Sequence, residues 1–560
     1  MSYAPLWESA ARELEELRNR PAETLSQIDS VDGTVATWIA HWALTRPETT
    51  AVHFYGRDIT YAELDNLADR AAEWLRLHGV STGDRVALYM GNCPQYLILF
   101  VAIMRLGAVL VPVNPMFRAS DFTYEINDSS PKVVVAQEEL REVVEASRAD
   151  LDSVPHVAYT RLSDTLTATP QPRAPFEREE VSADWQEITN TAPLAQRPEV
   201  DPASLAALNY TGGTTGLPKG CEHTHEHMVY TALSTLAVRG MRPGDKPEVY
   251  LCFLPIFWIA GENAGILNPL VDGSTVVLLT RDHPDAVLEL LEDQKVTFMV
   301  APADVYYELL AKDVASRSLV LDQVLAVSFV RKLTVDLREQ WMEATGSLLC
   351  EAAYGMTETH TMDTSTFGLQ ENNQDLQAEP IYTGYPVPGT QIVVVDHDLK
   401  PVKPGEIGQI LINSPSVLTR YFNRPEATEE SLVEGWLLTG DTGRFDEHGG
   451  LTYLARTKEM IKVNGMSVFP AELESFFKQH PEVGSVAVAP RDDSKRGQVP
   501  VAFIVRAEGS LITADELTDW ARTNIAEYKI PEITFVEAMP MTATGKIRKV
   551  DLVAALNQED

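Results

Sequence analysis

The sequence predicts an α/β protein in which a large N-terminal domain of doubly covered sheets precedes a small α+β C-terminal domain. Short apolar runs rich in β-branched residues recur between helical patterns, as expected of parallel strands that are buried on both faces. The length of 560 residues, 44% of them hydrophobic, permits about three or four folding units at roughly 150 residues each. The predicted strands span residues 85–90, 109–113, 133–136, 205–209, 250–254, 274–279 and 298–300.

The most apolar stretch, residues 96–113, predicts a buried helix followed by a buried strand. Arg105 and Gly107 interrupt it, and its last five residues have a strand pattern, so a membrane span is disfavoured. Further on, residues 168–202 are rich in Pro, Thr, Ala and Glu and lack periodicity. We expect an exposed connection there rather than an autonomous domain.

The main domain boundary is expected at Arg456 to Lys458. Gly449-Gly450 and a short strand-like run precede this point, and the charged residues 455–459 are not periodic. The predicted domains are therefore residues 1–456 and residues 457–560.

Composition excludes several kinds of partner. The 46 Lys and Arg against 81 Asp and Glu give a formal net charge of −35, which repels nucleic-acid backbones and anionic lipids. Four scattered cysteines form no CxxC pair, and the first twenty residues carry glutamates where a signal peptide would be basic and then apolar. We expect a cytoplasmic protein with no nucleic-acid partner and no membrane span.

The strongest local signal is the run from Tyr210 to Gly220, which contains four glycines, three threonines and Lys219. Glycines let backbone N–H groups turn toward an anion, threonine hydroxyls add donors and the lysine adds a positive charge. The spacing is not that of a Walker A loop. A flexible surface loop is the alternative, but the threonines and the lysine together favour a phosphate cradle.

Residues 211–220 closely resemble the phosphate-binding loop of the adenylate-forming superfamily, which includes acyl-CoA synthetases, peptide-synthetase adenylation domains and luciferases. Further matches follow in order along nearly the whole chain, from Ile59-Thr60-Tyr61-Ala62-Glu63-Leu64 to Gly545-Lys546. The resemblance, closest to the acyl-CoA synthetase branch, implies that the C-terminal domain is mobile. It also implies that ATP is bound by Thr211, Gly212, Gly213, Thr214, Thr215, Gly216 and Lys219.

The run Tyr354-Gly355-Met356-Thr357-Glu358 resembles the second core motif of this superfamily. By that resemblance Tyr354 lies against adenine, Thr357 contacts the α-phosphate and Glu358 holds Mg²⁺. A carboxylate beside a polyphosphate is tolerable only when a cation separates the negative groups. Alone, such a run is more often an ordinary helix start with a threonine N-cap.

Asp441, in Thr439-Gly440-Asp441, and Arg456 resemble the pair that grips the ribose hydroxyls. An acceptor carboxylate and a guanidinium suit a vicinal diol, whereas a surface ion pair is the alternative for such residues in isolation.

The C-terminal run from Pro540 to Lys549 resembles the mobile catalytic loop of the superfamily. Its Lys546 would bridge the substrate carboxylate and the α-phosphate, neutralising charge as two anions are brought together. The resemblance also makes Lys458 the hinge between the domains and Gly465 the glycine that lets pantetheine pass close to the backbone.

Two departures from the superfamily pattern fall where the acyl group is expected. Many relatives have small residues where this chain has Ser328-Phe329-Val330-Arg331-Lys332-Leu333, and many carry His at the position of Trp258. Trp258, Phe329 and Val330 are therefore the predicted acyl-pocket residues. His223, His225 and His227 alternate and could bind a metal from one face of a strand, although a structural role is favoured.

The leading hypothesis is an ATP-dependent carboxylic acid:CoA ligase acting on a fatty acid, with ATP, Mg²⁺ and coenzyme A as substrates and activator. The alternatives are a stand-alone enzyme that loads a carrier protein, and a CoA ligase for a short, aromatic or betaine-like acid. A non-catalytic nucleotide-binding regulator is the hypothesis from another class. The segment Ala526-Glu527-Tyr528-Lys529-Ile530-Pro531 resembles that of CoA ligases and favours CoA as the acceptor.

Overall fold

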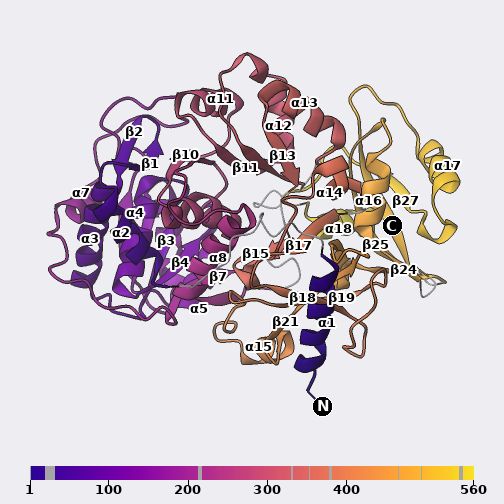
Figure 1. Cartoon of the computed structure of the whole chain (residues 1–560), viewed down its shortest axis with the longest axis horizontal. Helices are drawn as coiled ribbons and strands as arrows, with labels where there is room; N and C mark the ends of the chain where they lie inside the picture. Colours follow the sequence, from indigo (N-terminus) through magenta and orange to yellow (C-terminus); the bar gives the residue numbers. More distant parts are fainter. Residues whose placement is uncertain are drawn as a thin grey trace.

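The structure is a computed structural model of the chain. It describes residues 2–18, 32–211, 217–328, 332–351, 354–377, 381–463, 466–493, 495–541 and 547–559. The chain folds into a mixed α/β architecture. The large N-terminal part lies on the left and in the centre of Figure 1, and the C-terminal part lies on the right. The predicted fold class is confirmed.

The first sheet has the strand order β6-β5-β3-β4-β7-β8 and is parallel except for the β7–β8 pair. Val86 and Leu88 of β3 face the core that contains α4, whereas Ala87 and Tyr89 face a second core with α5, so the sheet is covered on both faces. Its elements are β3 (Arg85–Tyr89), β4 (Val109–Val113), β5 (Val133–Gln137), β6 (His156–Thr160), β7 (Leu205–Tyr210), β8 (Gly220–Thr224), α3 (Tyr61–Leu77), α4 (Pro94–Leu106), α5 (Ala119–Ser129), α6 (Arg141–Ser147) and α8 (His225–Val238).

The second sheet has the order β13-β12-β11-β9-β10-β1-β2 and is parallel except for the β1–β2 hairpin. One continuous apolar core joins it to α4 and the first sheet. Its elements are β1 (Thr50–Phe54), β2 (Arg57–Thr60), β9 (Val249–Cys252), β10 (Thr275–Leu278), β11 (Phe298–Pro302), β12 (Gln323–Val327), β13 (Leu348–Glu351), α2 (Val35–Thr45), α9 (Ile259–Glu262), α10 (Asn268–Asp272), α11 (Pro284–Asp293), α12 (Ala303–Leu310) and α13 (Val335–Thr345).

The apolar stretch at residues 96–113 forms a buried helix and a buried strand, as predicted. Pro94 begins α4, and Gly107 ends it in the left-handed conformation with φ of 62°, which glycine adopts without steric cost. Every residue of α4 and β4 is buried. Among the helices in the described ranges, none combines the length and apolarity that crossing a membrane requires.

The expected connection at residues 168–202 contains a helix that the composition did not indicate, α7 (Ala183–Asn190). Ser182 begins it by accepting a hydrogen bond from the Trp185 backbone N–H. Trp185 and Ile188 are buried against the large core, so two apolar side chains one turn apart are sufficient to dock this short helix.

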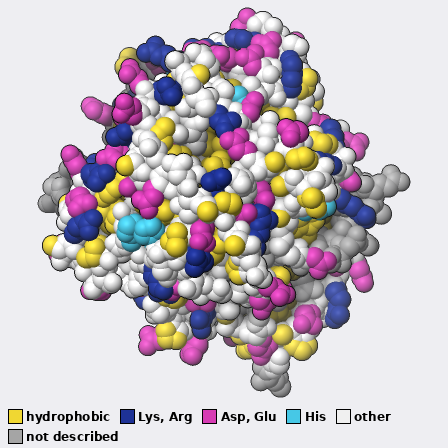
Figure 2. Space-filling model, turned by 90° about the vertical axis from the view of Figure 1, so that its left-hand side faces the viewer, with side chains coloured by type: hydrophobic (Ala, Val, Ile, Leu, Met, Phe, Trp, Pro, Cys, Tyr) yellow, Lys and Arg dark blue, Asp and Glu magenta, His cyan; other side chains and the backbone are white. Residues whose placement is uncertain are grey.

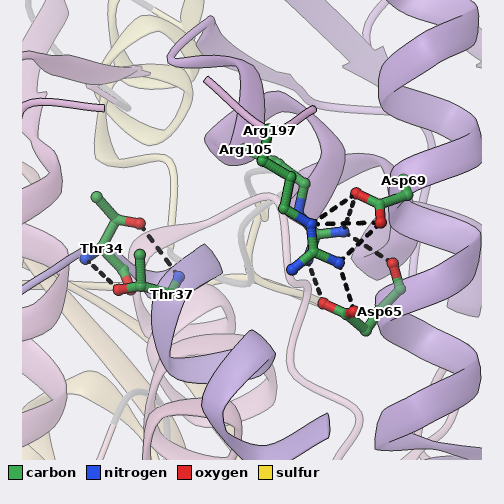
Figure 3. Close-up of polar contacts among 6 residues, drawn as sticks. All are labelled: Thr34, Thr37, Asp65, Asp69, Arg105 and Arg197. Atoms are coloured by element: carbon green, nitrogen blue, oxygen red, sulfur yellow. Dashed lines mark hydrogen bonds and ion pairs between the residues drawn. The ribbon is translucent and has the colours of Figure 1, made fainter. Parts of the chain in front are cut away.

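Arg105 on α4 connects α3, α4 and the connecting segment through ion pairs (Figure 3). Its side chain is 2% exposed and lies 2.5 Å from Asp65 and 2.8 Å from Asp69, both on α3. Arg197, which is 36% exposed, pairs with the same two carboxylates. Thr34 and Thr37, also drawn in Figure 3, cap the start of α2 reciprocally.

A third, antiparallel sheet has the order β16-β17-β22-β21-β19-β18, with β20 paired to β21. The N-terminal helix α1 (Ala4–Leu17) lies across it, with Trp7 and Ala11 buried against β18 and β19 (Figure 1). Its elements are β16 (Thr364–Ser365), β17 (Ile381–Pro386), β18 (Gln391–Val395), β19 (Gly408–Asn413), β20 (Leu432–Val433), β21 (Trp436–Phe445), β22 (Leu451–Arg456) and α15 (Pro425–Ser431).

The C-terminal sheet has the order β24-β23-β26-β25, and β27 pairs with β26. The 3-10 turn η8 (Thr457–Glu459) links it to β22. Its elements are β23 (Ile461–Val463), β24 (Met466–Val468), β25 (Val483–Asp493), β26 (Gly497–Arg506), β27 (Glu532–Phe535), α16 (Pro470–Lys478), α17 (Ala514–Asn524) and α18 (Lys549–Glu559).

Charge is mixed over the face formed by α2, α3 and α7. Figure 2 shows acidic and basic side chains interleaved there. On this face the excess of acidic residues forms no block of a single sign, so it keeps the surface hydrated without marking a docking site for a polycation.

Candidate active site

The predicted phosphate loop connects the end of β7 to the start of β8. Its two described ends are joined, because the Thr211 N–H donates to the Lys219 carbonyl at 2.9 Å and the Lys219 N–H donates to the Thr211 hydroxyl at 3.2 Å. Thr211 and Lys219 therefore lie side by side at the mouth of the loop. The predicted residues between them, Gly212, Gly213, Thr214, Thr215 and Gly216, lie outside the described residues.

Thr357 and Glu358 lie in a tight turn rather than at the start of an α-helix. The short strands β14 (Gly355–Met356) and β15 (Thr361–Met362) pair, and the 3-10 turn η6 (Thr357–Thr359) connects them. The Leu418 N–H donates to the Glu358 carbonyl at 2.7 Å, and the Tyr421 hydroxyl donates to Glu358 Oε1 at 3.0 Å. The glutamate is therefore fixed at both its backbone and its side chain.

Tyr354, Asp441 and Arg456 form one cluster on the third sheet. Asp441 on β21 and Arg456 on β22 are directly opposite in the antiparallel register, and Arg456 Nε lies 2.9 Å from Asp441 Oδ1. The Tyr354 hydroxyl donates to Asp441 Oδ2 at 2.6 Å, and its ring stacks on Tyr453 at 5.8 Å. The carboxylate is buried while the guanidinium is half exposed, so the pair presents a cation at the surface of the cluster.

Electrostatic coupling joins this cluster to Glu358. Burial raises the pKa of Asp441, Arg456 opposes the rise, and the negative charge of Glu358 adds to it. The Asp441 carboxylate is therefore close enough to Glu358 for the two charges to repel. Two acidic groups that converge on a site containing Lys219 and Arg456 are suited to a ligand that brings phosphates together with a cation.

The three alternating histidines do not share a face of a strand. β8 ends at Thr224, so His223 is on the strand whereas His225 and His227 begin α8. Within the described part of the chain, no group of three or more His, Cys, Asp or Glu residues could hold a metal ion.

His223 instead supports the Thr357 turn. Its Nε2 lies 2.8 Å from the Thr357 carbonyl, which can only accept, so this nitrogen carries the proton. His227 contacts the other ring nitrogen at 3.3 Å, and the His360 ring lies 4.6 Å away, centroid to centroid. Burial, then His360 and His227, hold the pKa of His223 well below its usual value, which keeps the ring neutral.

Of the predicted acyl-pocket residues, only Trp258 is described. It precedes α9 and its ring packs edge-to-face on Phe257 at 5.2 Å. The chain turns tightly between Pro255 and Gly261. A Cβ on Gly261 would lie only 1.9 Å from the Pro255 carbonyl oxygen. Phe329 and Val330 lie outside the described residues.

Glu351 is a candidate site residue that the sequence motifs did not identify. At the end of β13 it accepts hydrogen bonds from the Ser328 hydroxyl at 2.6 Å and the Ser328 N–H at 3.2 Å. Burial raises its pKa to about 7, although both bonds to Ser328 oppose the rise. The sequence signal that could have identified it is a carboxylate at the end of a short apolar run, in β13 (Leu348–Glu351).

The C-terminal candidates are only partly described. Lys458 lies in η8, between β22 and β23, whereas Gly465 and Lys546 lie outside the described residues. Lys549, the last residue of the predicted catalytic loop, forms an ion pair with Glu474 of α16 at 2.7 Å. This pair anchors the C-terminal end of the loop to α16.

The family model described as AMP-binding enzyme matches residues 39–422, and the model of the AMP-binding enzyme C-terminal domain matches residues 472–546. The chain belongs to the AMP-binding enzyme family. It is therefore an adenylate-forming acid–thiol ligase, which activates a carboxylic acid with ATP and passes the acyl group to CoA, rather than a non-catalytic nucleotide binder.

Relatives of this family member act on different acids. A long-chain-fatty-acid–CoA ligase of Bacillus subtilis is 28% identical over 90% of both chains. The 4-coumarate–CoA ligase 3 of rice, Oryza sativa subsp. japonica, is 31% identical over 90% of this chain and 88% of its own. The crystal structure of the anthranilate CoA ligase AuaEII with anthranoyl-AMP superposes with a TM-score of 0.80, at 26% identity, over 95% of this chain and 99% of that one.

Proposed function

We propose that this ligase activates a fatty acid, and that Lys219, Glu358, Tyr354, Asp441 and Arg456 bind its MgATP. The observation that carries the assignment is the convergence of these residues. Tyr354 and Arg456 both contact Asp441, and the charge of Asp441 interacts with that of Glu358. Glu358 and Lys219 both contact Tyr421. Loop, turn and sheet residues far apart in sequence thus meet in one polar site.

The proposed reaction has two steps. The fatty acid carboxylate attacks the α-phosphorus of ATP, the bond to the pyrophosphate oxygen breaks, and acyl-AMP forms. The CoA thiol then loses its proton and attacks the acyl carbon, which breaks the bond to AMP and releases the thioester. Thr357 and Lys546 are assigned to the α-phosphate, where positive charge and hydrogen bonds stabilise the first transition state.

Glu358 is the proposed magnesium ligand. Its half-buried carboxylate has one oxygen on the Tyr421 hydroxyl, and no three-ligand cluster exists among the described side chains. Such a site suits Mg²⁺, which takes one or two protein carboxylates and completes its shell with phosphate oxygens and water. When bound, the ion would neutralise charge between the triphosphate and Glu358.

A mobile C-terminal domain, residues 457–560, with Lys458 as its hinge is part of the proposal. In support, β22 ends at Arg456, and the following turn η8 leads directly into the C-terminal sheet. Rotation there would exchange Lys546 for Gly465 at the site between the two steps.

The fatty-acid assignment follows the Bacillus subtilis relative. An aromatic acid is the second candidate, because the rice 4-coumarate ligase is similarly related and Trp258 places a flat ring, packed on Phe257, at the start of α9. Incubation with MgATP, CoA and a panel of both acid classes, with AMP and pyrophosphate measured, separates them. A higher kcat/KM for aromatic acids would overturn the first assignment, and acyl-AMP that persists until a carrier protein is added would overturn CoA as the acceptor.

Lys546→Ala tests the catalytic assignment. We expect at least a 100-fold loss of pyrophosphate exchange, because a lost electrostatic contact to the transition state costs about 3 kcal/mol, while thiolysis of supplied acyl-AMP is retained. Arg548→Ala removes the same charge from an exposed position two residues away and should retain both activities. Equal losses in the two half-reactions of Lys546→Ala would contradict the assignment.

A further inference from the structure

Tyr421 lies between two oppositely charged members of the candidate site. Its side chain is buried, with 4% of the residue exposed. Its hydroxyl donates to Glu358 Oε1 at 3.0 Å, and the Lys219 ammonium lies 4.1 Å from the centroid of its ring. One phenol therefore contacts a carboxylate through its edge and a cation through its face.

The backbone on both sides of Tyr421 is fixed against β8. The Thr419 N–H donates to the Glu222 carbonyl at 3.0 Å, the Glu222 N–H donates to the Arg420 carbonyl at 3.0 Å, and Tyr421 forms an antiparallel bridge with Cys221. The Tyr421 N–H donates to the Thr428 hydroxyl at 3.0 Å. This framework holds the ring beside the start of β8, where the chain leaves the phosphate loop.

Lys219 and Glu358 act on the same neighbour without forming an ion pair with each other. Burial raises the pKa of the Cys221 thiol well above its usual value, with Glu358 adding to the rise and Lys219 opposing it, so both charges lie near this thiol. Opposite charges attract more strongly in a partly buried site than in water. An ion pair between them would occupy the two groups assigned to the triphosphate and its cation.

We propose that Tyr421 is a positioning residue of the ligase reaction, whose hydroxyl holds the Glu358 carboxylate while its ring holds the Lys219 ammonium. The two charges stay apart, and each keeps a side free for the nucleotide. The inference rests on the proposed roles of Lys219 and Glu358 in binding MgATP. It adds a residue that prevents Lys219 and Glu358 from forming an ion pair with each other before the nucleotide binds.

The two contacts can be removed separately. Tyr421→Phe keeps the ring under Lys219 and loses only the hydroxyl on Glu358, whereas Tyr421→Leu loses both. The measurement is the dissociation constant of ATP by calorimetry without any acid substrate, once in EDTA and once in excess Mg²⁺. The ratio of the two constants reports the contribution of the cation.

For Tyr421→Phe we expect wild-type affinity for ATP in EDTA, within about 3-fold, and a Mg²⁺-dependent gain reduced about 10-fold by loss of a charge-assisted hydrogen bond. For Tyr421→Leu the affinity in EDTA should also fall about 10-fold, because Lys219 pairs with Glu358. Adding Glu358→Gln to Tyr421→Leu removes that partner and should restore the affinity in EDTA. A purely structural role of the ring predicts no such rescue.

Tyr61→Phe is the matched control, since it deletes a buried phenol hydroxyl, bonded to the Ser274 carbonyl at 2.7 Å, on α3. It should bind ATP like the wild type under both conditions. If the wild type itself binds no ATP, the proposed function fails. If the wild type binds ATP and Tyr421→Phe keeps the full Mg²⁺-dependent gain, the positioning role fails even if Tyr421→Leu does not fold.

Discussion

Single buried polar residues in this protein have effects that hydropathy does not reveal. His225 shows the energetic side of this: it is fully buried at the start of α8, and its ring nitrogens find no hydrogen-bond partner in the described structure. Burial lowers its pKa from 6.5 to about 4. The folded state therefore takes up the proton only below about pH 4, whereas an unfolded chain takes it up near 6.5.

His225→Met should flatten the dependence of stability on pH. The contribution of His225 is fully present above pH 6.5 and is lost as pH falls toward 4, so at pH 5 the wild type loses about 2 kcal/mol relative to the variant. Urea unfolding midpoints at pH 7.5 and pH 5, followed by tryptophan fluorescence, measure the difference. The exposed substitution His397→Gln should follow the wild type, and parallel curves for all three proteins would refute the prediction.

Sequence motifs identified the charged members of the candidate site but not the residues that orient them. Lys219, Glu358 and Arg456 were predicted because they fall within recognisable runs. Tyr421 and His223 act through a ring face or a backbone carbonyl of a residue more than 60 positions away, and only the folded register brings those groups together. No local pattern encodes such contacts.

At the scale of elements, continuously apolar parallel strands were predictable, and antiparallel strands interrupted by polar residues were not. The run at residues 109–113 became β4 with the same bounds, because strands covered on both faces are continuously apolar. The third sheet, which carries Asp441 and Arg456, was missed apart from its β22 run, since polar residues and glycines interrupt the apolar runs of strands such as β21. The helix α7 was missed because only Trp185 and Ile188 give it an apolar face.

Arg105→Met tests how α3 and α4 are held together. Removing a guanidinium that is 2% exposed leaves Asp65 and Asp69 without their buried partner, and we expect a loss of about 3–5 kcal/mol in unfolding free energy. Arg197→Met removes the solvent-exposed partner of the same carboxylates and should cost about 1 kcal/mol or less. Comparable losses in chemical denaturation would show that the two arginines are equivalent.

At the scale of the whole molecule, the proposed domain rotation must break specific contacts. Lys332, in the segment expected to line the acyl channel, donates a hydrogen bond to the Ser475 hydroxyl of α16 in the C-terminal domain. A second arrangement of the domains would have to release this bond, whereas the chain connection through η8 would remain.

Lys458→Pro tests the hinge. Proline fixes φ near −65°, so the arrangement for one step is retained and the transition is hindered. We expect pyrophosphate exchange within about 3-fold of the wild type and overall CoA thioester formation reduced at least 10-fold, corresponding to about 1.4 kcal/mol on the barrier. Lys458→Ala, which keeps backbone freedom, should retain both rates, and unimpaired thioester formation by the proline variant would rule out rotation at this residue.

The helix α1 has a consequence for how the protein is made. Glu434 accepts hydrogen bonds from the Tyr3 and Ala4 N–H groups, and Trp7 packs on Trp436 at 5.8 Å. About 420 residues separate the end of the helix from that tryptophan, so a ribosome needs roughly 20–80 s to supply the surface that covers it. During that time the newly made helix has an uncovered tryptophan face, which is a substrate for chaperones that bind nascent chains. Packing of Trp7 on Trp436 therefore cannot begin before β21 has been synthesised.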